Sequence, residues 1–442
     1  MLLECRVECG GGCLAPLTEC TTSARDAQVA ALLLSCGLRI FHCVIAPTRT
    51  VSLSESHHGE AFMNEPLGLP IEQESISPPE RIDLIVVKLP FVHPFGTSVQ
   101  VWTHKEALLL RYEGGGVVAW SECVADPDPY YLSETTGTVR HILREFLLPA
   151  LVAGSTLGGV MTTCRHVRGH EMAKATLENA LVVALALEHN VPLHTLLGCP
   201  ERKIPSGISI GLRDTCAELL DAVESAVERN YHRVKMKIKR GKDVEWVRAV
   251  RERFPDIQLM VDANGDYTMH DAAHLRQLDA FGLTMIEQPL SYSDIYQHSL
   301  LQKQLRTPLC LDECLHGIDD VAAAIALDAC RIINIKQGRV GGILESIRIA
   351  RYAKDHNIGV WSGGMDETGI GRALNIHLQT ADGFSLPGDT SETRNYFTED
   401  IVDPPVVLDR HGFIGIPPGP GLGVSVDPDR LLKYMIHAER II

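Results

Sequence analysis

Residues 232–239 read HRVKMKIK, and this stretch decides the fold because short apolar runs of the same kind recur on both sides of it, separated by amphipathic segments. Such alternation is typical of parallel βα units. Eight runs within about 190 residues favour a closed (β/α)8-type barrel over an open doubly wound sheet. The predicted strands are SGISIG (206–211), HRVKMKIK (232–239), IQLMVDAN (257–264), LTMIEQPL (283–290), TPLCLDEC (307–314), RIINIKQG (331–338), IGVWSGG (358–364) and FSLPGD (384–389).

A different pattern precedes the barrel segment. Residues 81–90, 99–112 and 117–125 are rich in strand-forming residues and predict an antiparallel sheet. Two helical segments follow, and the first, after Thr135, carries Phe146 and its apolar neighbours on helical spacing. Strands followed by helices indicate an α+β domain. The predicted division is an α+β domain at 76–200, an α/β barrel domain at 201–400 and a segment at 401–442 that packs back on the first domain.

The composition excludes several classes of protein. A formal net charge of −15 argues against nucleic acid as a partner, and 45% hydrophobic with 22% charged residues is ordinary for a soluble globular protein. Six of the thirteen cysteines lie in the first tenth of the chain, and none forms a CxxC pair. This usage favours free thiols in a reducing compartment, so we expect a cytoplasmic protein.

The amino-terminal region has no clear periodicity. The apolar stretch at 29–47 is interrupted by Arg39 and His42, so it predicts neither a membrane span nor a signal peptide, and no membrane partner is expected. Residues 1–75 are interpreted as a disordered tail or an over-long reading of the gene, since Met63 stands shortly before the first convincing strand.

Charged residues stand at the carboxyl ends of five consecutive predicted strands. They are 25, 25, 25 and 24 residues apart, and Trp361 follows after another 25. In an α/β barrel these strand ends open onto one face, so the side chains should converge. A lone acid at a strand end is usually a helix cap, but five charged residues in one pattern predict a catalytic site. The residues are Lys237, Asp262, Glu287, Asp312 and Lys336.

The three acids lie on adjacent strands and should form an arc. Carboxylates this close repel one another unless a hard cation such as Mg²⁺, or alternatively Mn²⁺, binds them. A substrate carboxylate on such an ion has a more acidic α-proton, because the ion neutralises the enediolate. Lys237 and Lys336 should face each other across the barrel mouth, and Lys235 adds like charge that favours a neutral amine at Lys237.

At these residues the sequence resembles the enolase superfamily, specifically the o-succinylbenzoate synthase and N-acylamino acid racemase group of its muconate-lactonising-like branch. The resemblance covers about residues 81–425. It implies a TIM-like, modified (β/α)7β barrel preceded by an α+β capping domain, with a lysine base and Mg²⁺. The motifs are KMK (235–237), DAN (262–264), IEQPL (286–290), LDE (311–313), NIKQGRVGG (334–342), SGGMDETGIGR (362–372) and LPGDTS (386–391).

The resemblance also implies roles for single residues. Lys237 and Lys336 would be the acid/base pair, and Asp262, Glu287 and Asp312 the metal ligands. The loop HPFGTS at 93–98 would close over the substrate. Lys235, Asn264 and Glu313 would orient the metal and the lysines, while Phe95, Ser98, Ser209, Gly363, Gly364 and Met365 would contact the substrate.

Three functions stay open. The first is a lyase, o-succinylbenzoate synthase, which dehydrates 2-succinyl-6-hydroxy-2,4-cyclohexadiene-1-carboxylate on the route to menaquinone. The second is an isomerase that racemises N-succinyl or other N-acyl amino acids with the same two lysines. The third is a non-catalytic barrel scaffold, which the clustered charges disfavour because they cost folding energy without a metal. A small-molecule carboxylate is the expected substrate, and the resemblance implies a homo-oligomer.

Overall fold

The computed structural model describes residues 6–9, 13–16, 67–152 and 155–442. The chain divides into two compact units, Met1–Phe62 and Met63–Ile442. In the first unit, strands β1 (Arg6–Cys9) and β2 (Cys13–Pro16) pair antiparallel. Most of the stretch interpreted from sequence as a tail lies outside the described residues. The described part of the second unit begins at Leu67 and includes the 3-10 helix η1 (Pro70–Gln73).

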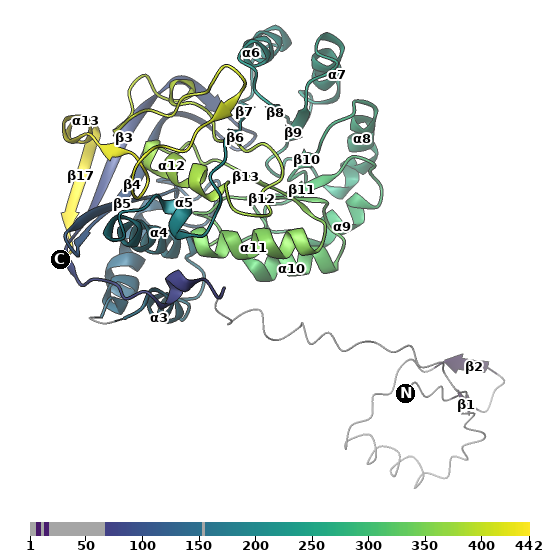
Figure 1. Ribbon diagram of the computed structural model, residues 1–442. Coiled ribbons are helices and arrows are strands. Elements are labelled where there is room, and N and C mark those ends of the chain that lie inside the picture. Colours follow the sequence, from purple (N-terminus) through teal and green to yellow (C-terminus); the bar gives the residue numbers. More distant parts are fainter. Residues whose placement is uncertain (1–5, 10–12, 17–66, 153–154) are drawn as a thin grey trace. The chain divides into compact units, whose positions relative to one another are not determined.

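A four-stranded antiparallel sheet forms the capping part of the second unit (Figure 1). The three predicted strands are present, and the fourth comes from the other end of the chain. That strand was not predicted because MIHAER lacks an apolar alternation, and it lies at the sheet edge with mostly exposed side chains. In spatial order the strands are β17 (Met435–Arg440), β3 (Pro79–Gly96), β4 (Val101–Gly114) and β5 (Val117–Cys123).

The helical part of the capping region differs from the prediction at its first helix. Thr135 caps that helix by accepting from the Thr138 amide, but after one α-helical stretch the backbone becomes π-helical and then 3-10. Phe146 lies in this π turn and is 53% exposed, whereas its apolar neighbours Leu143 and Leu147 are buried. The helices are α2 (Thr136–Ile142), η2 (Leu143–Leu147), η3 (Leu148–Ala150), α3 (Leu157–Cys164), α4 (Glu171–Glu188) and α5 (Leu193–Leu196).

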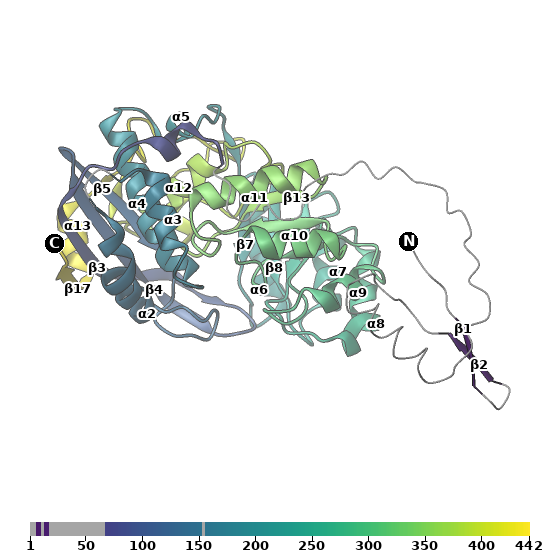
Figure 2. The same ribbon diagram turned by 90° about the horizontal axis from the view of Figure 1, so that it is seen from below.

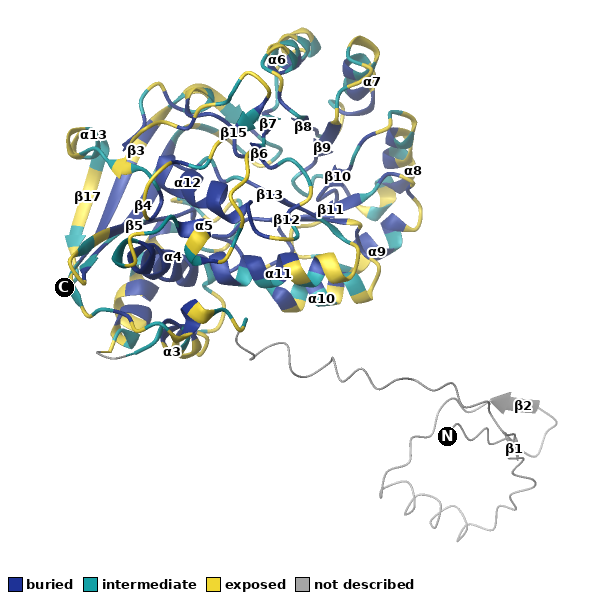
Figure 3. Cartoon of the chain, in the orientation of Figure 1, coloured by how far each residue is buried: buried dark blue, intermediate teal, exposed yellow. Residues whose placement is uncertain are grey.

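Seven parallel strands follow in unbroken sequence order, and helices surround them (Figure 1). The burial pattern agrees, since the strands are buried and the surrounding helices alternate buried and exposed faces (Figure 3). The strands are β7 (Gly207–Ile210), β8 (Arg233–Lys237), β9 (Leu259–Asp262), β10 (Ile286–Glu287), β11 (Leu309–Leu311), β12 (Ile332–Ile335) and β13 (Gly359–Ser362). The helices are α6 (Cys216–Glu228), α7 (Val244–Arg253), η4 (Met269–Asp271), α8 (Ala272–Leu275), η5 (Arg276–Ala280), α9 (Tyr296–Gln302), α10 (Ile318–Ala326), α11 (Ile343–Asp355) and α12 (Gly369–Leu378).

The eighth predicted strand, 384–389, does not form a regular ladder. Its proline lacks an N–H, which rules out an unbroken set of backbone hydrogen bonds. The segment nevertheless bonds to both neighbours, because the Asp389 amide donates to the Ser362 carbonyl (2.8 Å) and the Gly207 amide donates to the Gly388 carbonyl (2.7 Å). It therefore joins β13 to β7 and closes the barrel.

A layer of large side chains fills the barrel interior. Met260, Met285, Cys310 and Trp361 form one buried cluster there, and the Trp361 indole N–H donates to the Cys310 sulfur at 3.3 Å. The Lys235 ammonium lies 4.9 Å from the centre of the Trp361 ring. Trp361 continues the regular spacing of the charged strand ends, but its side chain belongs to the packed interior beneath the barrel mouth.

The remaining elements tie the two parts of the unit together. Helix α4 packs against both β5 of the capping sheet and α11 of the barrel (Figure 2). Of the described residues, no helix is long and apolar enough to span a membrane. The short elements are β6 (Ile204–Pro205), η6 (Thr393–Asn395), β14 (Val402–Asp403), β15 (Phe413–Ile414), β16 (Ser425–Val426) and α13 (Pro428–Tyr434).

Candidate active site

The charged strand ends converge, but they are staggered along the barrel axis. Lys237, Asp262 and Glu287 stand directly opposite one another on β8, β9 and β10. The residue opposite Glu287 on β11 is Cys310, so Asp312 lies two positions further along. An offset of two keeps the side chain on the same face. All five predicted residues, including Lys336, are at least nine-tenths buried at this end of the barrel.

Lys237 is held by the loop that follows β9. Its ammonium donates to an Asp262 carboxylate oxygen at 2.6 Å and to the Asn264 side-chain oxygen at 2.8 Å. Asn264 adopts a left-handed backbone conformation (φ 44°), which asparagine tolerates better than most residues. Its side-chain amide nitrogen donates to Glu313 at 2.8 Å. Asn264 therefore fixes the position of Lys237 and links it to Glu313.

Lys336 is held by a different set of partners. Its ammonium donates to the Tyr131 hydroxyl at 2.6 Å and to Asp312 at 2.8 Å. Burial lowers the pKa of Lys336, but Asp312 and Glu313 raise it above its ordinary value on balance. The second oxygen of Asp312 pairs with the Arg339 guanidinium. Burial raises the pKa of Asp312, yet Lys336 and Arg339 hold it well below its usual range.

Lys235 supplies a fixed positive charge beneath the two lysines. Its ammonium lies 2.5 Å from Asp389, 3.1 Å from Glu287 and 3.5 Å from Asp262. Burial lowers the pKa of Lys235, but these three carboxylates raise it well above its ordinary value. Because Lys235 is charged and only two residues from Lys237, the like charge expected from the sequence is present.

The three acids have the chemistry of a site for a hard divalent cation. Burial raises the pKa of Glu287 well above its usual value, and the charges of Asp262 and Asp312 raise it further. One buried oxygen of Glu313 has no hydrogen-bond partner. Carboxylate oxygens are the ligands that Mg²⁺ prefers, and a dication would remove the repulsion between them. The donor set therefore fits the ion.

The carboxylates are turned toward ammonium groups in this structure. Asp262 is bonded to Lys237, Glu287 to Lys235 and Asp312 to Lys336. Within the described part of the chain, no three Asp, Glu, His or Cys side chains are grouped as ligands of one ion. Binding of a cation would thus require these oxygens to exchange lysine partners for the metal.

A cavity lies over the two lysines, between the barrel mouth and the capping region. Of the predicted substrate contacts, Phe95, Ser209, Gly364 and Met365 line it, together with Lys235, Lys237, Asn264 and Lys336. Ser98 does not line it, because its hydroxyl donates to the Ala263 carbonyl at 3.0 Å. Gly363 lies behind the wall, where a Cβ would overlap the Asn334 side chain.

Several residues of the site were not predicted. Arg339 lies within the motif NIKQGRVGG and Asp389 within LPGDTS, but the resemblance implied no separate role for either residue. Tyr131 follows β5 in a loop without periodicity, and nothing in the sequence distinguishes it from the exposed Tyr130. Thr97, which also lines the cavity, belongs to the predicted loop at 93–98. The remaining unpredicted lining residues are Phe91, Trp102, His104, Lys105, Asp126, Asp366 and Tyr396.

Comparison with known proteins places this site in a family. Residues 81–198 match the family described as mandelate racemase / muconate lactonizing enzyme, N-terminal domain, and residues 218–430 match the one described as enolase C-terminal domain-like. An N-succinylamino acid racemase of Amycolatopsis sp is 43% identical over 353 residues, which cover 79% of this chain and 95% of the relative. The chain belongs to the enolase superfamily. The predicted family and the predicted barrel with its α+β capping domain are confirmed.

Other members of the enolase superfamily extend the likeness. An o-succinylbenzoate synthase of Bacillus subtilis (strain 168) is 41% identical over 359 residues, which cover 80% of this chain and 96% of the relative. A crystal structure of a superfamily member from Listeria innocua Clip11262 superposes with a TM-score of 0.80 at 37% identity, covering 84% of this chain and all of the other. Enzymes of this superfamily generally use Mg²⁺. Relatives thus carry two different enzyme names on one fold.

Proposed function

We propose that this protein is an o-succinylbenzoate synthase, which removes water from 2-succinyl-6-hydroxy-2,4-cyclohexadiene-1-carboxylate. The observation that carries the proposal is the pair of buried lysines, Lys237 and Lys336, that line one cavity beside three strand-end carboxylates. Several relatives at about 40% identity bear this name over most of the chain. The activity belongs to menaquinone biosynthesis, and we propose a cytoplasmic location and a homo-oligomeric state.

The proposed chemistry divides between the lysines. Lys237, as the free amine, removes the proton from the carbon next to the substrate carboxylate. Lys336 stays protonated and stabilises the negative charge that develops on the substrate. Lys237 then returns the proton to the departing hydroxyl, which leaves as water, so no net proton is consumed. Mg²⁺, held by Asp262, Glu287 and Asp312, would polarise the substrate carboxylate when bound.

A second candidate is racemisation of N-succinylamino acids. It is favoured by the separate attachment of the two lysines, since Lys237 is held through Asn264 and Lys336 through Tyr131, on opposite strands of the barrel. Two bases on opposite sides of one carbon can exchange roles as acid and base. The name of the Amycolatopsis relative agrees with this activity.

A paired assay with Mg²⁺ tests both candidates. Wild type and Lys237→Ala are followed by loss of cyclohexadiene absorbance and, in parallel, by polarimetry of N-succinylamino acids, with the exposed Lys303→Ala as matched control. Fast dehydration with slow racemisation, both lost only in Lys237→Ala, is the expected result. The reverse ratio would make the enzyme a racemase. A wild type inert in both assays would overturn the proposed substrates.

A further inference from the structure

Each of the three lysines of the site has two kinds of partner. One is a carboxylate that we expect to bind Mg²⁺, and the other is a group outside the expected ligand set. The second partners lie within 2.8 Å of the ammonium groups, and they are Asn264 for Lys237, Tyr131 for Lys336 and Asp389 for Lys235. When the expected ligands turn to an ion, each ammonium keeps its second partner.

Lys235 differs from the other two lysines because it lies close to two of the expected metal ligands. Its ammonium is 3.1 Å from Glu287 and 3.5 Å from Asp262. A dication bound by these carboxylates would repel the ammonium and offset the negative charge that now stabilises it. Among the ion pairs of Lys235 with described residues, only the one with Asp389, at 2.5 Å, involves no expected ligand. Because a buried ammonium without an anionic partner is costly, Asp389 decides what metal binding costs at Lys235.

Asp389 is held in place by contacts that do not involve the expected ligands. Its backbone amide donates to the Ser362 carbonyl at 2.8 Å, and its second carboxylate oxygen pairs with the Arg233 guanidinium. Arg233 is buried and lies over the Trp361 ring, 4.5 Å from its centre. Burial raises the pKa of Asp389, but Lys235 and Arg233 lower it to about 2, so the carboxylate is ionised near neutral pH. Asp389 thus presents a fixed negative charge to Lys235.

The same contacts argue against Asp389 as a further metal ligand. One of its carboxylate oxygens pairs with Lys235 and the other with Arg233. Arg233 makes no other ion pair with the residues that the structure describes. If Asp389 turned to an ion, the buried guanidinium would lose its anionic partner, which is strongly destabilising.

We propose that Asp389 is a positioning residue for metal binding, because it retains the Lys235 ammonium when Mg²⁺ takes over Glu287 and Asp262. This role rests on the metal requirement of the proposed function. Asp389 acts through Lys235 and does not touch the ion. Partners outside the ligand set that act in this way contribute roughly 10- to 100-fold to metal affinity.

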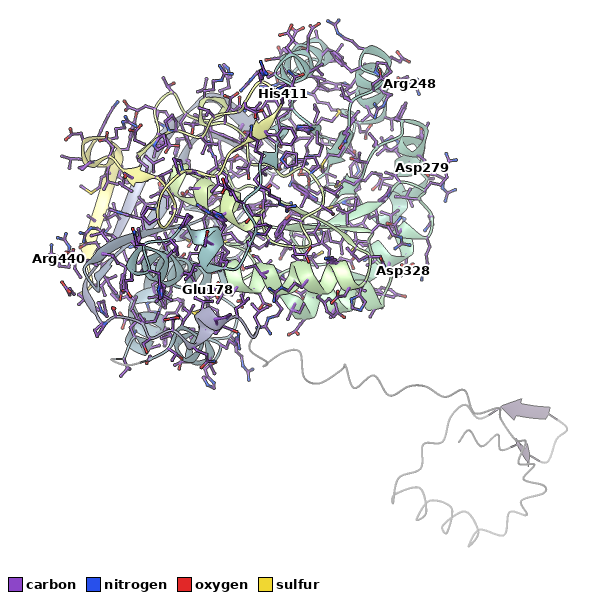
Figure 4. The ribbon with its side chains drawn as sticks, viewed as in Figure 1. Glu178, Arg248, Asp279, Asp328, His411 and Arg440 are labelled. Atoms are coloured by element: carbon purple, nitrogen blue, oxygen red, sulfur yellow. The ribbon has the colours of Figure 1, made fainter. Side chains whose placement is uncertain are left out.

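The test measures metal affinity without turnover. Protein freed of metal with EDTA is titrated with Mn²⁺ in the absence of substrate, and free Mn²⁺ is followed by electron paramagnetic resonance. Asp389→Asn, which keeps the size of the side chain and an acceptor for Arg233, should raise the Kd for Mn²⁺ by about 10- to 100-fold. The matched control is Asp328→Asn, at an exposed aspartate that pairs with Arg331 (Figure 4), and it should bind Mn²⁺ as wild type does.

A double-mutant cycle separates this role from a general effect of charge or folding. Lys235→Met removes the competing ammonium, so its Kd for Mn²⁺ should equal that of wild type or fall below it. In the Lys235→Met background, Asp389→Asn should change the Kd by less than about threefold, because no ammonium is left to retain.

The outcomes distinguish this role from the proposed function. A Kd for Asp389→Asn within about twofold of wild type, or an equal loss of affinity with and without Lys235, would overturn the role of Asp389 while the metal site stands. Weaker binding by Lys235→Met than by wild type would overturn it as well, even if Asp389→Asn does not fold, because the ammonium would then support the ion. A wild type that binds no Mn²⁺ would overturn the metal site of the proposed function, and this role would fail with it.

Discussion

Replacing Tyr131 with phenylalanine removes a single hydroxyl group from the proposed active site. The Tyr131 hydroxyl accepts from the Lys336 ammonium at 2.6 Å and donates to Asp312 at 3.3 Å. Burial, with Asp312 next, raises the pKa of Tyr131 well above its ordinary value, so the hydroxyl keeps its proton. The variant keeps the aromatic ring, whose centre is 5.1 Å from the ammonium. It therefore removes one of the two hydrogen bonds of Lys336 and the hydrogen bond that the hydroxyl donates to Asp312.

The expected loss follows from the charge on Lys336. A hydrogen bond to a charged group contributes about 1.5–3 kcal/mol, which is roughly 10- to 150-fold in rate if the bond is needed in the transition state. We expect kcat/KM for dehydration with saturating Mg²⁺ to fall by about 30-fold. The matched control is Tyr130→Phe, the preceding residue, whose side chain is 71% exposed. Rates of the two variants within twofold of each other would refute the role given to Tyr131.

Three further predictions concern stability, packing and the metal. Burial raises the pKa of Glu178, labelled in Figure 4, to about 8, so the folded chain keeps a proton that the unfolded chain loses from about pH 4.5. The free energy of unfolding of wild type therefore falls as pH rises through 8. In urea unfolding, Glu178→Gln should gain about 3 kcal/mol in this free energy relative to wild type between pH 5.5 and 8.5, whereas exposed Glu252→Gln should follow wild type. Gly363→Ala should lower the melting temperature and activity together, because the added Cβ overlaps Asn334, and normal values for both would contradict this packing. EDTA should abolish dehydration and Mg²⁺ restore it; full activity after exhaustive chelation would exclude the metal.

The sequence predicted the barrel because its strand pattern repeats at nearly constant spacing. The same spacing gave no indication of the stagger between strands. Although the separations in sequence are nearly equal, Trp361 lies in the interior, and Asp312 lies two positions beyond the residue of β11 that stands opposite Glu287. Spacing depends on helix and loop length, whereas register depends on strand pairing, which a single sequence does not display.

The sequence could not show the parts that depend on long-range pairing. Strand β17 joins the capping sheet through backbone hydrogen bonds that need no apolar pattern. The closing segment at 384–389 bonds both neighbours despite its proline. Tyr131 and Arg339 reach Lys336 and Asp312 from loops, where periodicity gives no signal. Strand ends were therefore predictable, and the residues that hold their side chains in place were not.

The central claim is that Lys237 and Lys336 lie on opposite sides of one substrate carbon, with Lys237 the base in dehydration and both lysines able to exchange the α-proton of an N-succinylamino acid. The most direct measurement is α-proton exchange in D2O, with Mg²⁺, from each enantiomer of an N-succinylamino acid by Lys237→Ala and Lys336→Ala. Each variant is predicted to lose exchange from one enantiomer and to retain it from the other, with opposite preferences. Exchange of both enantiomers at the wild-type rate by either variant would contradict the claim.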